Sequence, residues 1–428
     1  MEELAAALSE ARERSIALVE DLSDEQLLGP RLAIVNPLLW EIGHVAWFQE
    51  KWVLRHAAGL PPLRADADAL YDSAAVAHDT RWDLPLPSLA ATLRYARDVR
   101  DRVIERCAGG EPLPQEAYFL RLCLFHEDMH AEAFTYTRQT LGYPPPSPAG
   151  APVSAPPPPD PGARGDVCVP GGTFVLGAER GEPFVFDNEK WAHEVEVRPF
   201  AIARCAVTQG EFADFAADGG YERRELWSEE GWRSLGDERP RGPLHWRREG
   251  GGWLRRHFDV WLPLERDLAM VHVSWHEAQA YCRWAGRRLP TEIEWEVAAA
   301  GGPDGAGGLA SSKRRFPWGG EAPGGRHANL DSRHTGCIAA SSLPAGDSAF
   351  GCRQMTGNVW EWTSSDFLPY PGFSADPYQE YSEPWFGTHK VLRGGCWATR
   401  ARLLRNTWRN FYTPERRDVF AGLRTCAP

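Results

Sequence analysis

A proline-rich run about a third of the way along the chain restricts what it can fold into. The stretch YPPPSPAGAPVSAPPPPDPGA, Tyr143 to Ala163, cannot be helix interior or a central strand, because proline fixes φ and lacks a backbone N–H donor. We interpret residues 143–164 as a linker of semi-rigid polyproline character. It divides the 428-residue chain into an amino-terminal domain, 1–142, and a carboxy-terminal domain, 165–428.

The amino-terminal domain has the pattern of a helical bundle. Apolar residues recur at three-to-four spacing in segments 2–21, 36–57, 87–107 and 115–141, with Pro and Gly concentrated between them. Four such segments predict a four-helix bundle, joined by a long irregular connection at 58–86.

The carboxy-terminal domain has a different pattern. Short apolar runs such as GTFVLG and HEVEVRPFAIA alternate with Gly, Pro and Asp, which predicts short strands. Only TQGEFADFAADG and SWHEAQAYCRWAG predict clear helices, the second with Ser274 as N-cap and Glu277 three residues later. The pattern indicates a mixed α+β domain with many irregular loops.

Composition disfavours several classes of function. The net charge of −12 disfavours a nucleic-acid partner, because phosphate binding relies on clustered Lys and Arg. No run approaches the roughly 18 apolar residues of a membrane span, and the first helical segment lacks a signal peptide's apolar region. We therefore expect a cytoplasmic protein with no membrane partner. We also expect a monomer. The nine cysteines include no C-x-x-C pair, so neither a disulfide framework nor a zinc knuckle is indicated.

The stretch LFHEDMHAEAF points to a metal. His126 and His130 are four residues apart, so both can face one spot from a single helix. His44 lies on the second helical segment among large apolar residues, and the second and fourth helices of a bundle can both face its core. A site of three neutral histidines that leaves coordination positions open suits Fe(II) or Zn(II), and the spacing does not discriminate between these two metals. An exposed histidine pair without a metal is the alternative that spacing leaves open.

Seven further motifs occur in order along the carboxy-terminal domain. They are VPGGTFVLG, AVTQGEFADF, VSWHEAQAYCRWAGRRLPTEIEWEVAA, FPWG, MTGNVWEWTSSDF, VLRGGCW and GLRT. Together they resemble the formylglycine-generating, sulfatase-modifying fold, a relative of C-type lectins, and the amino-terminal domain resembles the DinB-like four-helix bundle. The fusion, with HEDMHAE matching H-x-x-x-H-x-E, resembles the ergothioneine-type sulfoxide synthases, including their selenoneine synthase branch.

This resemblance implies an activity and a set of site residues. It implies that His44, His126 and His130 hold a non-haem Fe(II), and that O2 is a co-substrate. The family joins a sulfur or selenium donor to the imidazole C2 of hercynine, the Nα-trimethylated betaine of histidine. Its catalytic tyrosine falls in a Tyr-x-x-Tyr-Ser segment, here YQEYS, so Tyr378 is the catalytic match and Tyr381 its neighbour.

The carboxy-terminal loop departs from part of that family. Members that use γ-glutamylcysteine have a loop resembling Asn-Trp-Asp-x-Pro-x-Arg-Arg, and here it reads NFYTPERR. Asn410 and Arg416 match, whereas Phe411 replaces the tryptophan and Tyr412 replaces the acid. A donor with two carboxylates and an ammonium needs charged partners, because an unpaired buried charge is costly. The bundle's long connection also offers few cationic partners for such a donor. In its segment YDSAAVAHDTRWDLPLP, Arg81 is the only arginine.

These departures favour the selenoneine branch, in which the donor is a neutral selenosugar, and groups such as Asn410 and Tyr412 would meet its hydroxyls. A C–S bond to γ-glutamylcysteine or cysteine is the alternative. Two other classes stay open at this point: a zinc-dependent thiol transferase, as some DinB-like bundles are, and a non-catalytic lectin-like binding module. The bound metal and the need for O2 discriminate among them.

Overall fold

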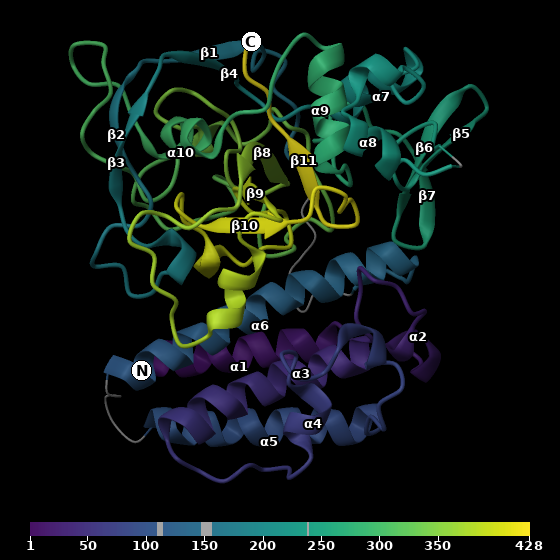
Figure 1. Ribbon diagram of the computed structural model, residues 1–428, viewed down its shortest axis with the longest axis vertical. Helices are drawn as coiled ribbons and strands as arrows, with labels where there is room; N and C mark the ends of the chain where they lie inside the picture. The colour runs from purple at the N-terminus through teal and green to yellow at the C-terminus, as the bar shows by residue number, and fades with distance from the viewer. Residues whose placement is uncertain (109–113, 147–155, 238) are drawn as a thin grey trace. The chain divides into compact units, whose positions relative to one another are not determined.

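The computed structural model describes residues 1–108, 114–146, 156–237 and 239–428 (Figure 1). The chain divides into two compact units, unit 1 at 1–150 and unit 2 at 151–428. Part of the proline-rich segment, 147–155, lies outside the described residues, and the domain boundaries inferred from that segment stay a prediction.

Unit 1 is helical. Its elements are α1 (Glu2–Ala17), α2 (Asp24–Leu28), α3 (Leu38–Gln49), the π-helix η1 (Glu50–Ala57), α4 (Ala67–Tyr71), the 3-10 helix η2 (His78–Thr80), α5 (Leu89–Ala108) and α6 (Pro114–Leu141). Helix α1 packs against α5 and α6, and α3 packs against the same two helices, so four long segments share one core (Figure 1). Leu27, Ile42 and Phe134 lie in that core with no exposed surface. The predicted segments are helical here, although α1 ends four residues before 21.

The second long segment changes its helical geometry partway. Every residue of α3 except Leu39 is buried, as expected of a helix with apolar residues on all sides. At Glu50 the α-helix passes into η1, whose π geometry the sequence pattern did not predict. The Glu50 carboxylate has no exposed surface and accepts hydrogen bonds from the Leu63 backbone N–H, at 2.9 Å, and from the Tyr95 hydroxyl. The connection after η1 is therefore tied back to the bundle.

The described residues of unit 2 contain short strands in four small sheets. The strands are β1 (Asp166–Val169), β2 (Gly172–Leu176), β3 (His193–Val197), β4 (Phe200–Ala203), β5 (Trp246–Glu249), β6 (Gly252–His257), β7 (Val260–Pro263), β8 (Trp360–Asp366), β9 (Lys390–Arg393), β10 (Arg409–Tyr412) and β11 (Ala421–Leu423). The largest sheet has the order β10-β9-β8-β11, in which β11 runs parallel to β8 and the other pairs are antiparallel. The remaining sheets are β1-β4, β2-β3 and the meander β5-β6-β7.

Helices and 3-10 turns connect these strands. They are η3 (Asp187–Glu189), α7 (Gln209–Ala217), η4 (Arg224–Leu226), α8 (Glu229–Ser234), α9 (Trp275–Trp284), α10 (Glu292–Ala300), η5 (Pro344–Gly346), η6 (Gln379–Tyr381), η7 (Glu383–Trp385) and η8 (Ala401–Leu403). Both predicted helices are present as α7 and α9, and the Ser274–Glu277 capping box forms as expected. Helices α8 and α10 were not predicted, although Ser228 caps α8 and Thr291 and Glu294 cap α10.

The core of unit 2 includes charged groups as well as apolar ones. Arg393 and Arg409 are fully buried, and both donate to the Glu292 carboxylate, with closest distances of 2.7 Å. Arg424 donates to Glu361 at 2.8 and 3.0 Å. Buried charges persist only when paired, so these bonds join distant segments of an otherwise loop-rich domain.

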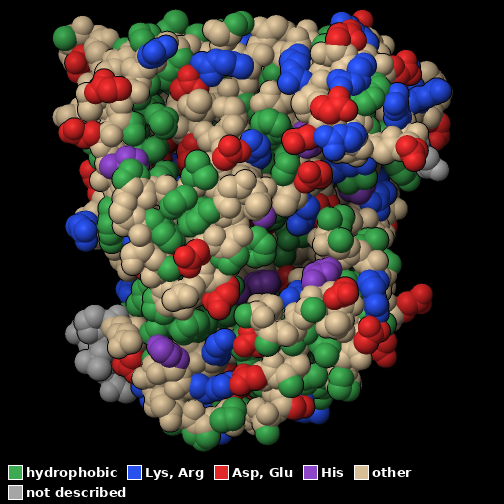
Figure 2. Space-filling view, in the orientation of Figure 1, with side chains coloured by type: hydrophobic (Ala, Val, Ile, Leu, Met, Phe, Trp, Pro, Cys, Tyr) green, Lys and Arg blue, Asp and Glu red, His purple; other side chains and the backbone are tan. Residues whose placement is uncertain are grey.

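The surface carries charges of both signs. On the face shown in Figure 2, Lys and Arg side chains are interspersed with Asp and Glu. Within the described residues, no helix has the length and apolarity needed to cross a membrane.

Candidate metal centre

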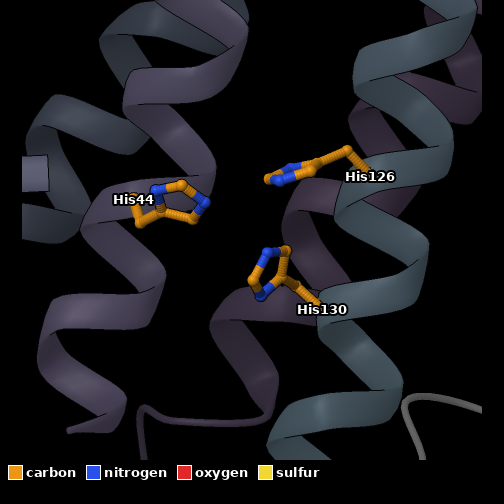
Figure 3. Close-up of side chains that lie close together, drawn as sticks. All are labelled: His44, His126 and His130. Carbon is orange, nitrogen blue, oxygen red and sulfur yellow. The ribbon is translucent and has the colours of Figure 1, made fainter. Parts of the chain in front are cut away.

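Three histidines meet inside unit 1. His44 comes from α3, and His126 and His130 come from successive turns of α6 (Figure 3). One ring nitrogen from each residue lies within 4.8 Å of those of the other two. The His126 and His130 ring centroids are 4.4 Å apart, and each is just over 5 Å from that of His44, at 5.2 and 5.1 Å. The structure thus brings together the three residues that sequence spacing singled out.

Aromatic rings fix the orientation of two of these imidazoles. Trp40, one helical turn before His44, stacks on it with centroids 4.9 Å apart and ring planes 10° from parallel. Phe48, one turn after His44, stacks on His126 with centroids 3.6 Å apart and planes 7° from parallel. The apolar residues of α3 therefore form walls around the histidines.

Hydrogen bonds at Nδ1 set the remaining geometry. His44 Nδ1 lies 2.8 Å from the Tyr71 carbonyl oxygen, and His130 Nδ1 lies 2.6 Å from Glu41 Oε1. An Nδ1–H that donates to oxygen leaves the Nε2 lone pair for a metal, and such outer partners also raise ligand basicity. Sequence reasoning did not single out Glu41. A buried acid one turn before His44 in an apolar helix was the available signal.

The local environment keeps two of the rings neutral. Burial, and then the neighbouring His130, hold the pKa of His44 well below its usual value. Burial, followed by the same neighbour and His44, does so for His126. Neutral imidazole is the form that binds metals. The donor set of three imidazole nitrogens, two with partners at Nδ1, fits Fe(II) or Zn(II).

Glu127, one of the two acids between the helix-α6 histidines, has a different role. Glu127 is 1% exposed, and both of its oxygens accept from the fully buried Arg12, at 2.7 and 3.1 Å. Arg12 also donates to Gln49 Oε1 at 3.2 Å. The Glu127 carboxylate is thus engaged in joining α1 to α6.

In unit 2, the predicted tyrosines lie in an aromatic cluster. Tyr378 precedes η6 and Tyr381 ends it, with ring centroids 6.1 Å apart. Tyr381 stacks on Phe186 at 4.5 Å and meets Phe411 edge-on at 5.7 Å. Burial raises the pKa of the Tyr381 phenol, which therefore stays protonated at neutral pH.

The predicted loop residues lie on and after strand β10. Phe411 stacks on Phe367 with centroids 4.0 Å apart, and Asn410 Oδ1 accepts from the Phe411 backbone N–H at 2.8 Å. The Arg416 guanidinium lies 5.0 Å from the Tyr412 ring centroid and pairs with Asp418 at 2.7 Å. Phe411 thus joins the tyrosine cluster, and Arg416 lies beside Tyr412.

Comparison with known families matches each unit separately. The DinB superfamily model matches residues 7–134, and the model of the Sulfatase-modifying factor enzyme 1-like domain matches residues 153–427. The predicted fold class, a DinB-like bundle followed by a formylglycine-generating-enzyme-like domain, is confirmed.

Individual relatives extend over both units. A hercynine oxygenase from Mycolicibacterium smegmatis is 38% identical over 436 residues, covering 99% of this chain and 98% of that protein. The hercynine oxygenase of Mycobacterium tuberculosis is 40% identical over 430 residues, with the same coverage of both chains, 99% and 98%. A formylglycine-generating enzyme from Streptomyces coelicolor is 34% identical over 316 residues, covering 66% of this chain and 95% of that one.

Proposed function

The chain belongs to the hercynine oxygenase family of ergothioneine-type sulfoxide synthases, and from that membership we propose that it uses O2 to join a selenosugar to the imidazole C2 of hercynine. The shared activity is that of an O2-dependent oxidoreductase acting on hercynine. The observation that carries the assignment is the convergence of His44, His126 and His130, with one ring nitrogen of each within 4.8 Å of the others, in a chain that aligns end to end with two hercynine oxygenases.

The reaction balances with O2 as the only oxidant. Hercynine loses the hydrogen on C2, and the donor loses the hydrogen on selenium, as the C–Se bond forms. One oxygen atom of O2 ends on selenium, and the other leaves as water with those two hydrogens. With a thiol donor the same balance gives a sulfoxide.

The residues of the chain have different roles in this reaction. Fe(II), when held by His44, His126 and His130, supplies the redox chemistry that O2 requires. Glu41 and the Tyr71 carbonyl keep two of those imidazoles in the tautomer that binds metal. The Tyr378 phenol supplies a proton to oxygen as O2 is reduced, which favours bond formation over oxidation of the donor alone. Aromatic faces suit the trimethylammonium group of hercynine, which offers no N–H to a hydrogen-bond acceptor.

The preference for a neutral donor is supported by how Arg416 is engaged. Arg416 pairs with Asp418 at 2.7 Å. A donor with two carboxylates would have to compete with Asp418 for this cation, whereas a sugar can use the hydroxyl and amide of Tyr412 and Asn410. The alternative donor is γ-glutamylcysteine or cysteine, giving a C–S bond.

A donor competition tests this function. Protein loaded anaerobically with Fe(II) would receive hercynine, O2, and equal concentrations of selenosugar and γ-glutamylcysteine, with products quantified by mass spectrometry. We expect the seleno-adduct to predominate. A predominant γ-glutamylcysteine adduct would assign the chain to the C–S branch.

A parallel assay separates the classes of chemistry. A zinc-dependent thiol transferase, whose metal the same three histidines also fit, would turn over with Zn(II) in the absence of O2. We expect turnover only with Fe(II) and O2 together.

A further inference from the structure

The loop that carries Tyr378 is attached at both ends to one short turn far away in sequence. We name residues 376–382 the tyrosine loop, and residues 187–190, which include the 3-10 helix η3, the anchoring turn. The two segments are separated by more than 180 residues, and their side chains bond directly.

The carboxy-terminal end of the tyrosine loop is attached through Ser382, which has no exposed surface. Its hydroxyl donates to Asp187 Oδ1 and accepts from Asn188 Nδ2, the latter at 3.0 Å. Asp187 is 2% exposed and Asn188 is fully buried. Water cannot readily replace these partners, so Ser382 has one well-defined position.

The amino-terminal end is attached through Asp376. Both of its carboxylate oxygens lie 2.7 Å from Lys190 Nζ, and its backbone N–H lies 3.4 Å from Asp187 Oδ2. The two side chains of this ion pair are 18% and 19% exposed. Asp187 therefore contacts both ends of the tyrosine loop, and Lys190 strengthens one of them.

The anchoring turn is itself held by buried arginines. Arg409 donates to the Asn188 carbonyl at 2.8 Å and forms a two-pronged pair with Glu292, at 2.7 and 3.0 Å. Arg405 forms a two-pronged pair with Glu189 of the turn, in which its Nε–H donates to Oε2 at 2.8 Å and its Nη2 donates to Oε1. Charge-assisted, two-pronged bonds of this kind fix both distance and orientation, so the turn is a rigid base.

The same base contacts the residues proposed to act on substrate. Arg409 is the first residue of β10, the strand that carries Asn410 and Phe411. Phe186, directly before the turn, stacks on Tyr381 at 4.5 Å. One rigid segment thus supports both the tyrosine loop and the strand predicted to contact the donor.

We propose that Asp187, Asn188 and Lys190 are positioning residues, which hold the Tyr378 phenol where it can deliver its proton by fastening Asp376 and Ser382 to one base. The inference rests on the proposed role of Tyr378. Proton delivery depends on geometry, and a displacement of about 1 Å can cost on the order of 100-fold in rate. Releasing either end of the loop should therefore impair coupling more than it impairs folding.

The test is the fraction of consumed O2 that ends in C–Se or C–S product, measured with product mass spectrometry and an oxygen electrode. Because this coupling ratio does not depend on how much enzyme is active, lost stability alone leaves it unchanged. We expect Ser382→Ala to lower it about 10-fold and Lys190→Met roughly 3-fold, with iron content and hercynine affinity retained. The Lys190 pair is partly exposed, so that variant remains informative if Ser382→Ala folds poorly.

A matched control acts on the other side of the same turn. Thr407 Oγ1 donates to Glu189 Oε2 at 2.7 Å but has no hydrogen bond to the tyrosine loop, and Arg405 still holds Glu189 without it. Thr407→Val should leave the coupling ratio at the wild-type value. A drop equal to that of Ser382→Ala would mean that general loosening of the domain, not attachment of the loop, sets the ratio, and would overturn the inference.

Comparison with Tyr378→Phe separates the two hypotheses. If Tyr378→Phe lowers the coupling ratio but Ser382→Ala and Lys190→Met do not, the positioning inference is wrong while the role of Tyr378 stands. If Tyr378→Phe leaves the ratio unchanged, the role of Tyr378 fails and this inference with it. In the Tyr378→Phe background, Ser382→Ala should lower the ratio no further, because both changes act through one phenol.

Discussion

Glu41 Oε1 lies 2.6 Å from His130 Nδ1, so the carboxylate on α3 orients a predicted ligand on α6. Glu41 is 1% exposed, so its carboxylate has little contact with water. Glu41→Gln keeps an oxygen acceptor but removes the negative charge that makes the imidazole a better ligand. We expect Fe(II) affinity to fall about 10- to 100-fold, the usual effect of losing such an outer partner. Competition with a chromophoric chelator measures it, with the exposed Glu3→Gln as control.

Removing a ligand itself should have a larger effect. His126→Ala should lose bound iron and at least about 1,000-fold in activity, while remaining folded, because only a small buried ring is removed from α6. Metal analysis and circular dichroism measure the two effects. His56→Ala is the matched control, since His56 is an exposed histidine of the same unit, on η1. Equal iron content in the two variants would contradict the assignment of His126 as a metal ligand.

The sequence was most informative where function depends on local spacing. His126 and His130 are one helical turn apart, so their shared direction follows from helix geometry alone. His44 required one more step, that helices of a bundle face a common core. The fold class followed from motif order, and the capping box at Ser274 followed from a four-residue pattern.

The features of the fold and the site that the sequence did not predict depend on contacts between residues distant in sequence. Glu41 and His130 are 89 residues apart, and Arg409 and Asn188 are 221 apart. No periodicity predicts which buried acid meets which base, because the partner is chosen by packing of whole elements. The π-helical turn at Glu50 was missed for a related reason: the sequence pattern of η1 still resembles that of an ordinary amphipathic helix.

The pair of Arg12 and Glu127 should be a major source of stability in unit 1. Arg12→Met leaves a fully enclosed carboxylate without its partner, which typically costs about 3–5 kcal/mol in the free energy of unfolding. Denaturant unfolding measures this change. In Arg12→Met/Glu127→Gln the unpaired charge is absent, so a large part of the loss should be recovered. Equal losses in the single and double variants would show that packing, and not charge, dominates at this position.

For the catalytic hypothesis, Tyr378→Phe is the most direct change. It removes only the phenol oxygen, so iron content and hercynine affinity should match those of the wild type. The coupling ratio should fall roughly 100-fold, the scale of a lost general acid, as O2 is diverted to a reaction in which the donor takes both oxygen atoms. Product ratios equal to those of the wild type would remove Tyr378 from the mechanism.

Unit 2 should lose stability in mild acid because the pKa values of two of its histidines, His257 and His272, are lowered in the folded state. Burial lowers the pKa of His257 to about 4, and likewise that of His272 to about 4, from a usual value of 6.5. Between pH 6.5 and 4, the unfolded chain therefore binds protons at these histidines that the native state does not bind. Their stabilising contribution is complete above pH 6.5 and is lost as the pH falls toward 4, by about 1.4 kcal/mol per pH unit for each proton.

His257 is the better histidine to change, because His272 contacts His245, with ring centroids 4.9 Å apart, and the titrations of that pair are linked. His257→Gln has no titrating group at this position, so the free energy of unfolding should depend less steeply on pH. Between pH 6 and 4.5 the slope should fall by roughly the contribution of one bound proton. Urea unfolding followed by tryptophan fluorescence at several pH values measures the slope. Parallel pH profiles for wild type and variant would mean that His257 protonates equally in both states, and would contradict the lowered pKa of His257.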